Sequence, residues 1–183
     1  MTGAARTVRF SGLPRSRWAN GLGETVELLA HAGRRPVRRA TEHRDDRLGR
    51  ALLVAARGGP RPAVPLATPL TLDLDGRRAV LDRFDAVSFA GEADVRAVGV
   101  TAPGYDLNLM VRRGTGRPTL AVASVDGEHE LHGVGVVLDG TVTGPDGTLA
   151  PFDAVIALDG TVTLTGQGRV AVVVPAAAGT PVG

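Results

Sequence analysis

From residue 51 onward the chain consists of short apolar runs separated by turn signals, and this pattern constrains the fold more than any other feature. Asp-Gly pairs stand between the runs, and both residue types tolerate the positive φ angles of tight hairpin turns. Few stretches show the periodicity of an amphipathic helix. The sequence therefore predicts an all-β fold built from antiparallel hairpins. The predicted strands are residues 52–55, 70–74, 79–81, 87–89, 95–100, 107–111, 120–123, 134–138, 155–158, 162–165 and 170–174, and the Asp-Gly pairs are 75–76, 126–127, 139–140, 146–147 and 159–160.

A short internal repeat indicates that the chain contains two related units. Phe84-Asp85-Ala86-Val87 recurs as Phe152-Asp153-Ala154-Val155. Each copy follows a strand and an Asp-Gly turn, 75–76 in the first case and 139–140 in the second. Each copy also precedes a strand, a turn with glycine and a Val-rich strand. Because the flanking elements agree as well, duplication explains the repeat better than chance.

Two similar antiparallel units in one short chain suggest a double β-barrel or a pair of jelly rolls. We expect the first barrel, with an N-terminal hairpin, at residues 1–115 and the second at 116–183. Two alternatives to this domain arrangement remain open. The whole chain 1–183 is also compatible with one compact domain, and the N-terminal segment is also compatible with a crossing that completes the second barrel.

Composition and charge argue against several classes of partner. The 183 residues include 21 basic residues, all of them Arg, and 19 acidic ones, for a net charge of +2. Arginine keeps its charge at high pH, so the basic isoelectric point of about 10.2 is weak evidence for nucleic acid. The Arg-rich segment 33–50 lacks interleaved aromatic residues and contains Glu42, Asp45 and Asp46. We expect a solvated surface there and no nucleic-acid partner.

The absence of certain sequence features sets further expectations. The chain has no Cys, which excludes disulfides and thiolate metal ligands. Residues 1–13 lack the apolar segment of a signal peptide, and no window approaches the roughly 20 apolar residues that span a membrane. We therefore expect a cytoplasmic protein with no membrane partner.

Residues 104–114 combine unusual side chains within one predicted strand. Strand alternation places Leu107, Leu109 and Val111 on one face and the acid, amide, thioether and guanidinium groups on the other. The second group is Asp106, Asn108, Met110 and Arg112. An apolar packing face backed by a polar face suits a binding site on a β-scaffold. The alternative is an edge strand whose polar face is solvated.

Two segments together resemble the HutD/Ves family. The first reads Trp18-Ala19-Asn20-Gly21-Leu22-Gly23-Glu24-Thr25, and the second reads Asp106-Leu107-Asn108-Leu109-Met110-Val111-Arg112-Arg113-Gly114. Phe89-Ala90-Gly91-Glu92 matches a third family pattern, F-x-G-[DE]. The resemblance spans residues 8 to 174. It implies a double-cupin fold and an association with histidine utilisation, in which these small proteins are thought to bind a pathway intermediate and restrain the pathway.

The chain departs from the family pattern in the centre of the sequence. Where the family reads roughly D-W-R-L-S-I-A, residues 45–51 keep Arg47 but place Asp46 at the tryptophan and Gly49 at the serine. Residues 59–69 likewise lose the family's Phe, Ser, Gly and Arg. The chain is therefore identified as a divergent member, whose ligand differs from that of the family or has been lost.

The resemblance implies a small carboxylate ligand, such as urocanate or a formylglutamate-like molecule. Arginine forks bind carboxylates bidentately, and amide side chains fix their orientation. The candidate ligand-binding residues are Trp18, Asn20, Thr25, Arg47, Asp106, Asn108, Met110 and Arg112. Arg47 and Arg112 would anchor the ligand, Trp18 or Met110 would form an apolar wall, and Asp106 would orient an arginine or cap a turn. The alternative is that these residues tie the N-terminal hairpin to the barrel.

Neither a metal site nor a catalytic site stands out. The four histidines are His31, His43, His129 and His132, and the last two flank Glu130 without a third histidine nearby. We expect no metal and no cofactor. No serine lies in a nucleophile motif, so no catalytic residue is assigned. A cupin enzyme of the isomerase or lyase class and an interaction protein with a degenerate pocket remain alternatives, and edge strands make a homodimer plausible.

Overall fold

The computed structural model describes residues 5–17, 24–31, 50–56, 64–65, 69–89, 93–99, 105–110 and 118–175. Within these ranges the regular elements are β-strands and one 3-10 turn, η1 (Phe10–Gly12). All strand pairs described are antiparallel and form three sheets. The all-β prediction is therefore confirmed. No helix in the described part of the chain is long and apolar enough to cross a membrane.

The chain divides into two compact units, one of which combines both ends of the sequence. Unit 1 is Met1–Gly12 with Arg113–Gly183, and unit 2 is Leu13–Arg112. Unit 1 contains β1 (Arg6–Val8), β10 (Thr119–Gly144), β11 (Gly147–Leu149) and β12 (Ala154–Val174), in the sheet order β1-β12-β10-β11. The N-terminal segment groups with the C-terminal half because β1 pairs with β12, with Thr7 opposite Val155.

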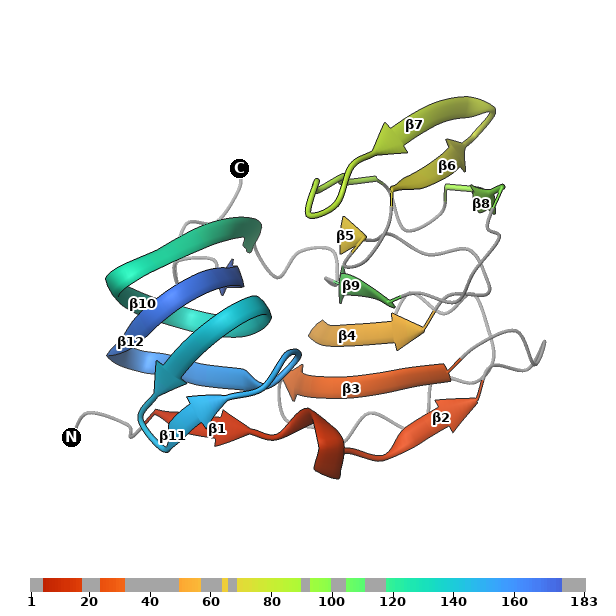
Figure 1. Cartoon of the computed structure of the whole chain (residues 1–183). Helices are drawn as coiled ribbons and strands as arrows, with labels where there is room; N and C mark the ends of the chain where they lie inside the picture. The colour runs from red at the N-terminus through yellow and green to blue at the C-terminus, as the bar shows by residue number, and fades with distance from the viewer. Residues whose placement is uncertain are drawn as a thin grey trace, which may run out of the picture. The chain divides into compact units, whose positions relative to one another are not determined.

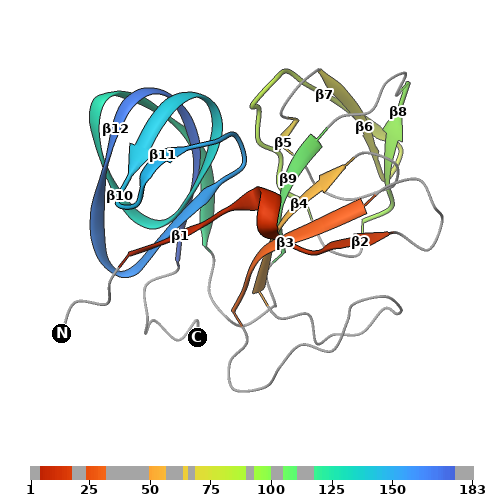
Figure 2. The same ribbon diagram turned by 60° about the horizontal axis from the view of Figure 1, so that its bottom comes forward.

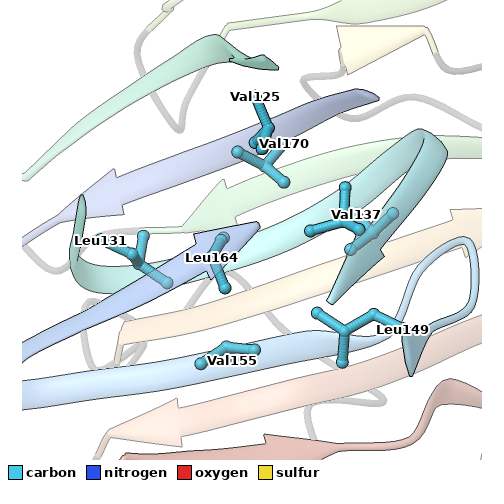
Figure 3. Close-up of a cluster of buried hydrophobic side chains, with 8 residues drawn as sticks. Val125, Leu131, Val137, Leu149, Val155, Leu164 and Val170 are labelled. Carbon is cyan, nitrogen blue, oxygen red and sulfur yellow. The ribbon is translucent and has the colours of Figure 1, made fainter. Parts of the chain in front are cut away.

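The two long strands of unit 1, β10 and β12, form a coiled ribbon. The first part of β10 pairs with the end of β12, so that Thr119 lies opposite Val174, and the ribbon then winds round until β10 meets β12 again. Val134 consequently lies opposite both Ile156 and Val173. Figures 1 and 2 show β10 and β12 wound around each other in this way. The coil encloses buried aliphatic side chains, shown in Figure 3: Val125, Leu131, Val137, Leu149, Val155, Leu164 and Val170.

The prediction that the Asp-Gly pairs mark hairpin turns is wrong for three of the five pairs, because these three do not end a strand. Residues 75–76 form the two-residue turn between β6 and β7, and 146–147 lie at the turn between β10 and β11. The other three pairs lie inside β10 or β12, so five predicted strands are parts of only two. Some glycines with positive φ inside β10 and β12, Gly140 and Gly166 among them, have a different role from that of a hairpin turn. At Gly166 (φ +119°) a Cβ would lie 2.2 Å from the Thr141 carbonyl oxygen, so glycine allows the coil to cross itself closely.

Unit 2 contains a five-stranded and a three-stranded sheet. The larger sheet has the order β2-β3-β4-β9-β5, with β2 at Arg15–Arg17, β3 at Glu24–His31, β4 at Arg50–Ala56, β9 at Tyr105–Met110 and β5 at Val64–Pro65. The smaller sheet has the order β7-β6-β8, with β6 at Leu70–Leu74, β7 at Arg77–Leu81 and β8 at Val95–Val98. Figure 1 shows the smaller sheet on the β5 side of the larger one.

The three-stranded sheet packs its own aliphatic cluster. Leu70, Leu72, Leu81 and Val95 are buried, and Val87 and Phe89 pack against them. The predicted strand 87–89 is wrong, since these residues form no regular strand. Their apolar side chains serve the core, and that need alone produces the strand-like pattern in the sequence.

The tetrapeptide repeat is also a structural repeat. Phe84 and Phe152 share the same unusual φ of 72°. In each copy the aspartate side chain accepts a hydrogen bond from the backbone N–H three residues earlier, at 2.9 Å for Asp85 and 3.0 Å for Asp153. The hairpin before the second copy turns at residues 145–146, however, and not at the predicted pair 139–140. Each unit therefore contains the same hairpin followed by the same aspartate-capped turn.

Candidate functional site

The polar face of β9 is buried. The exposed fraction is 7% for Asp106 and 1% for Asn108, and Leu107 on the opposite face is 1% exposed. β9 pairs with β4 from Tyr105 to Met110, and Asp106 and Leu107 also pair with β5. The alternative of a solvated edge strand is therefore wrong. Strands on both sides and packing on both faces remove this acid and amide from water.

Asp106 and Asn108 contact each other on this face. The Asn108 Nδ2 donates a hydrogen bond of 3.0 Å to the Asp106 Oδ2. The Asn108 Oδ1 is buried, and none of the described residues donates a hydrogen bond to it. A buried acceptor without a donor costs about 1–3 kcal/mol. This carboxamide oxygen is therefore a place where a hydrogen-bond donor from elsewhere would stabilise the protein.

The strand register aligns a third predicted site residue with this pair. One row across the five-stranded sheet contains Thr25, Ala55, Asp106 and Pro65. Directly paired residues share a face, and strands lie 4.7–4.9 Å apart, so Thr25 and Asp106 are separated by about 10 Å. The next row on the same face contains Glu27, Leu53 and Asn108. Thr25, Asp106 and Asn108 thus belong to one face of one sheet.

The remaining predicted site residues are not placed by side chain. Strand alternation puts Met110 on the face of Asp106 and Asn108, but only its backbone is described. Trp18, Asn20, Arg47 and Arg112 lie outside the described residues. The roles predicted for these four residues, including the arginine anchors, remain predictions.

Asp153 is a second buried carboxylate, and sequence reasoning gave it no role. Its Oδ1 accepts a hydrogen bond from the Phe10 backbone N–H at 2.9 Å, and its Oδ2 accepts one from the Arg9 guanidinium at 2.8 Å and one from the Ala150 backbone N–H at 3.0 Å. The Phe10 and Phe152 rings also meet edge to face, with centroids 5.3 Å apart. The signal in the sequence was the repeated Phe-Asp pair, but nothing in the sequence indicated its distant partner Arg9.

The environment of Asp153 holds it in the ionised form. Burial alone would raise the pKa of this carboxyl, but the hydrogen bonds from Arg9, Phe10 and Ala150 and the charge of Arg9 outweigh burial. The net pKa lies below its ordinary value. With three donors in place, the carboxylate is fully engaged in joining the N-terminal segment to the rest of unit 1, and this indicates a structural role.

The histidines gather no metal-ligand set in the described part of the chain. His132 is exposed, and its Nδ1 lies 2.9 Å from the Gly160 carbonyl oxygen. No group of three His, Asp or Glu side chains with ligand geometry occurs among the described residues. His43 and the side chain of His31 lie outside them.

Comparison with protein families decides the assignment of the chain. The family model described as HutD matches residues 60–174, which is more than half of the sequence. The chain belongs to the HutD family. The matched region includes β9 with Asp106 and Asn108 and both copies of the repeat, whereas the Trp18–Thr25 segment precedes it. No curated protein matches the chain.

Solved structures support the same assignment at the level of the fold. A conserved protein of unknown function, PA5104 from Pseudomonas aeruginosa PAO1, is 22% identical, with a TM-score of 0.72 over 93% of this chain and 98% of that one. HutD from Pseudomonas fluorescens SBW25, solved in a formate condition, is 20% identical, with a TM-score of 0.68 over 94% and 99%. YhhW from Escherichia coli is 8% identical, with a TM-score of 0.57 over 97% and 100%. These likenesses show that this HutD-family chain shares their fold.

Proposed function

We propose that this HutD-family chain is a double cupin that binds a small carboxylate metabolite on the polar face of β9. The observation that carries the proposal is the buried Asn108 carboxamide, whose oxygen has no donor among the described residues. A protein of this size has a total stability of roughly 5–15 kcal/mol, so an unmet buried acceptor is a substantial cost. Such a cost is understandable where a ligand completes the hydrogen bonding.

The double-cupin part of the proposal rests on the repeat. Both units contain a hairpin, a buried leucine, a phenylalanine with φ 72° and an aspartate-capped turn, in the same order. The buried leucines are Leu81 and Leu149. Agreement in an uncommon backbone conformation at both positions supports duplication of one barrel unit.

The choice of a carboxylate rests on the family and on the predicted arginines. The HutD family name connects the chain with histidine breakdown, where the intermediates are small carboxylates such as urocanate and formylglutamate. Arg47 and Arg112 are the proposed anchors, because a guanidinium binds a carboxylate through two parallel hydrogen bonds. The proposed role is recognition of such an intermediate as a sensor, by binding rather than turnover, in the cytoplasm.

A thermal-shift screen tests the proposal. The panel contains urocanate, formylglutamate, formiminoglutamate, formate and unrelated carboxylates. A ligand at about 100 times its dissociation constant adds roughly 2.7 kcal/mol to the free energy of unfolding, which raises Tm by about 5–10 °C for a chain of this size. We expect a selective increase with one of the histidine-pathway acids. No increase with any carboxylate would refute the proposed function and favour an interaction protein with an empty pocket.

A further inference from the structure

The three-stranded sheet of unit 2 has an open edge at β7. In the sheet order β7-β6-β8, β7 lies at one end and pairs with β6 alone among the described strands, as Figure 1 shows. Val80, near the middle of β7, is 71% exposed, which is the largest exposed fraction among the large apolar side chains described. An edge strand that presents an apolar side chain to solvent is a place where a further strand can pair.

The geometry of the β6–β7 hairpin determines which backbone groups face this edge. The turn at 75–76 has two residues with φ of 51° and 81°, so it is of type I′ and its hydrogen bond joins Leu74 and Arg77. Bonded pairs alternate along an antiparallel ladder, so every second residue of β7 bonds to β6. The N–H and C=O groups of Arg78 and Val80 therefore point to the open edge.

Val80 belongs to an exposed row that crosses the sheet. It lies opposite Thr71, and Thr71 lies opposite Val98, which is 36% exposed. Directly paired residues share a face, so these three side chains form a weakly polar stripe that ends at the open edge. A partner strand with an apolar side chain opposite Val80 would continue the stripe and remove Val80 from water.

Opposite charges flank Val80 at equal spacing. Arg78 precedes it by two residues, and Asp82, the residue after β7, follows it by two; both are exposed, and neither makes an ion pair among the described residues. Asp73, opposite Arg78, instead accepts a hydrogen bond from the Gly76 N–H at 2.7 Å. Four residues of extended chain span about 13 Å, so Arg78 and Asp82 do not reach each other within one chain.

The other arginines near this edge are engaged elsewhere. Strand alternation places Arg77 on the opposite face of the sheet. The Arg83 guanidinium lies over the Phe84 ring, 4.2 Å from its centroid, and Arg96 on β8 pairs with Asp94 at 2.9 Å. Arg78 is therefore the arginine on this face that is left to meet an acid on another strand.

We propose that β7 is a homodimer interface, at which two copies of the chain pair antiparallel with Val80 opposite the partner's Val80. A two-fold axis through this point sets Arg78 opposite the partner's Asp82 and repeats that pair on the other side. A register shifted by two residues would place Arg78 opposite the partner's Val80 and lose both charge pairs. The two three-stranded sheets join into one of six strands. The dimer requires no ligand, so it is independent of the proposed carboxylate site.

Sedimentation equilibrium of the full chain at 5 to 500 μM tests the pairing. One short strand from each copy makes a small interface, so we expect a weak dimer that forms within this range. Arg78→Asp sets two acids opposite each other, and Asp82→Arg sets two arginines opposite each other. Each change acts twice about the axis, so we expect each variant to raise the Kd of the dimer about 10-fold or more.

An equimolar mixture of these two variants provides the sharper test. A heterodimer of the Arg78→Asp chain with the Asp82→Arg chain has opposite charges at both positions again. We expect the mixture to associate about as tightly as the wild type, although each variant alone does not. Arg6→Asp makes the same charge change at an exposed arginine on β1, an edge strand of unit 1, and should leave the Kd unchanged.

Val80→Pro tests the backbone pairing. Proline removes the N–H that points to the open edge, and an edge strand tolerates proline where its N–H faces solvent. The hydrogen bonds between β6 and β7 are kept, so we expect a folded monomer, with a circular dichroism spectrum like that of the wild type.

Three results would overturn the inference. The first is a wild type that stays monomeric up to 500 μM, whether or not an Asp- and Glu-rich peptide binds to it at Arg78. The second is a dimer whose Kd neither charge variant changes, because another surface then forms it. The third is a mixture of the two charge variants that associates no better than either variant alone.

Discussion

Two buried polar side chains, Asp153 and Asn108, differ in how completely they are satisfied. Asp153 accepts hydrogen bonds from three donors, and these link Arg9 and Phe10 to the turn before β12. Asn108 donates to Asp106 but leaves its own oxygen without a donor among the described residues. A closed set of hydrogen bonds is typical of a structural residue, and an open one calls for an explanation, for which we propose a bound ligand.

The structural role of Asp153 makes stability depend on acid pH. Its folded-state pKa lies below the unfolded value of about 3.9, so its contribution is complete above that value and is lost as pH falls towards the folded pKa. We expect Asp153→Asn to lower the free energy of unfolding at pH 7 by about 2–3 kcal/mol, since it presents an amide to three donors. Below about pH 4 its stability should fall less steeply than that of the wild type. Urea unfolding at pH 2.5 to 7 measures both effects.

The repeat provides a matched control for this prediction. Asp85 occupies the equivalent turn, accepts a hydrogen bond from the Asp82 N–H and is exposed. Asp85→Asn should therefore cost much less stability at pH 7 and keep the acid dependence contributed by Asp153. Equal losses in the two variants would contradict the role assigned to the ion pair between Arg9 and the buried Asp153.

At the scale of elements, local sequence signals identified strands but not how the strands continue. Alternation in residues 106–112 correctly grouped Asp106 with Asn108 on one face. It could not reveal that this face is buried, because burial depends on β4 and β5, which are distant in sequence. Asp-Gly pairs signal positive φ, and positive φ serves a hairpin at 75–76 and a coiled strand at 139–140. The sequence signal is the same in both cases, so the length of β10 and β12 could not be predicted from local sequence.

The crossing of β10 and β12 depends on glycine at specific points, and this can be tested by substitution. At Gly166 a Cβ would clash with the Thr141 carbonyl oxygen, whereas at Gly147 (φ +99°) nothing lies within 4 Å. Alanine is strained at both positions by about 1–2 kcal/mol. Gly166→Ala should cost a further 1–3 kcal/mol or so, because backbone must move. Thermal unfolding of the two variants measures the difference, and equal destabilisation would contradict the close crossing of β10 and β12.

At the scale of the whole molecule, the two ends of the chain belong to one unit, and the candidate site belongs to the other. Unit 1 joins Met1–Gly12 to Arg113–Gly183 through the β1–β12 pairing and the Arg9–Asp153 ion pair. Unit 2 contains Thr25, Asp106 and Asn108 on one face of its larger sheet. The repeat indicated two units, but the partner of the N-terminal strand depends on long-range pairing that composition and spacing do not encode. The same limit applies to Arg9, whose partner lies 144 residues away.

The central claim is that unit 2 binds a carboxylate at the polar face of β9. An NMR titration of ¹⁵N-labelled protein with urocanate tests it most directly, because the side-chain amide of Asn108 and the backbone amides of each unit are observed separately. We predict the largest shift changes at the Asn108 side chain, at residues 105–110 and at Thr25, with little change around Asp153. Changes confined to residues 118–175, or a spectrum unaltered at millimolar urocanate, would contradict the claim.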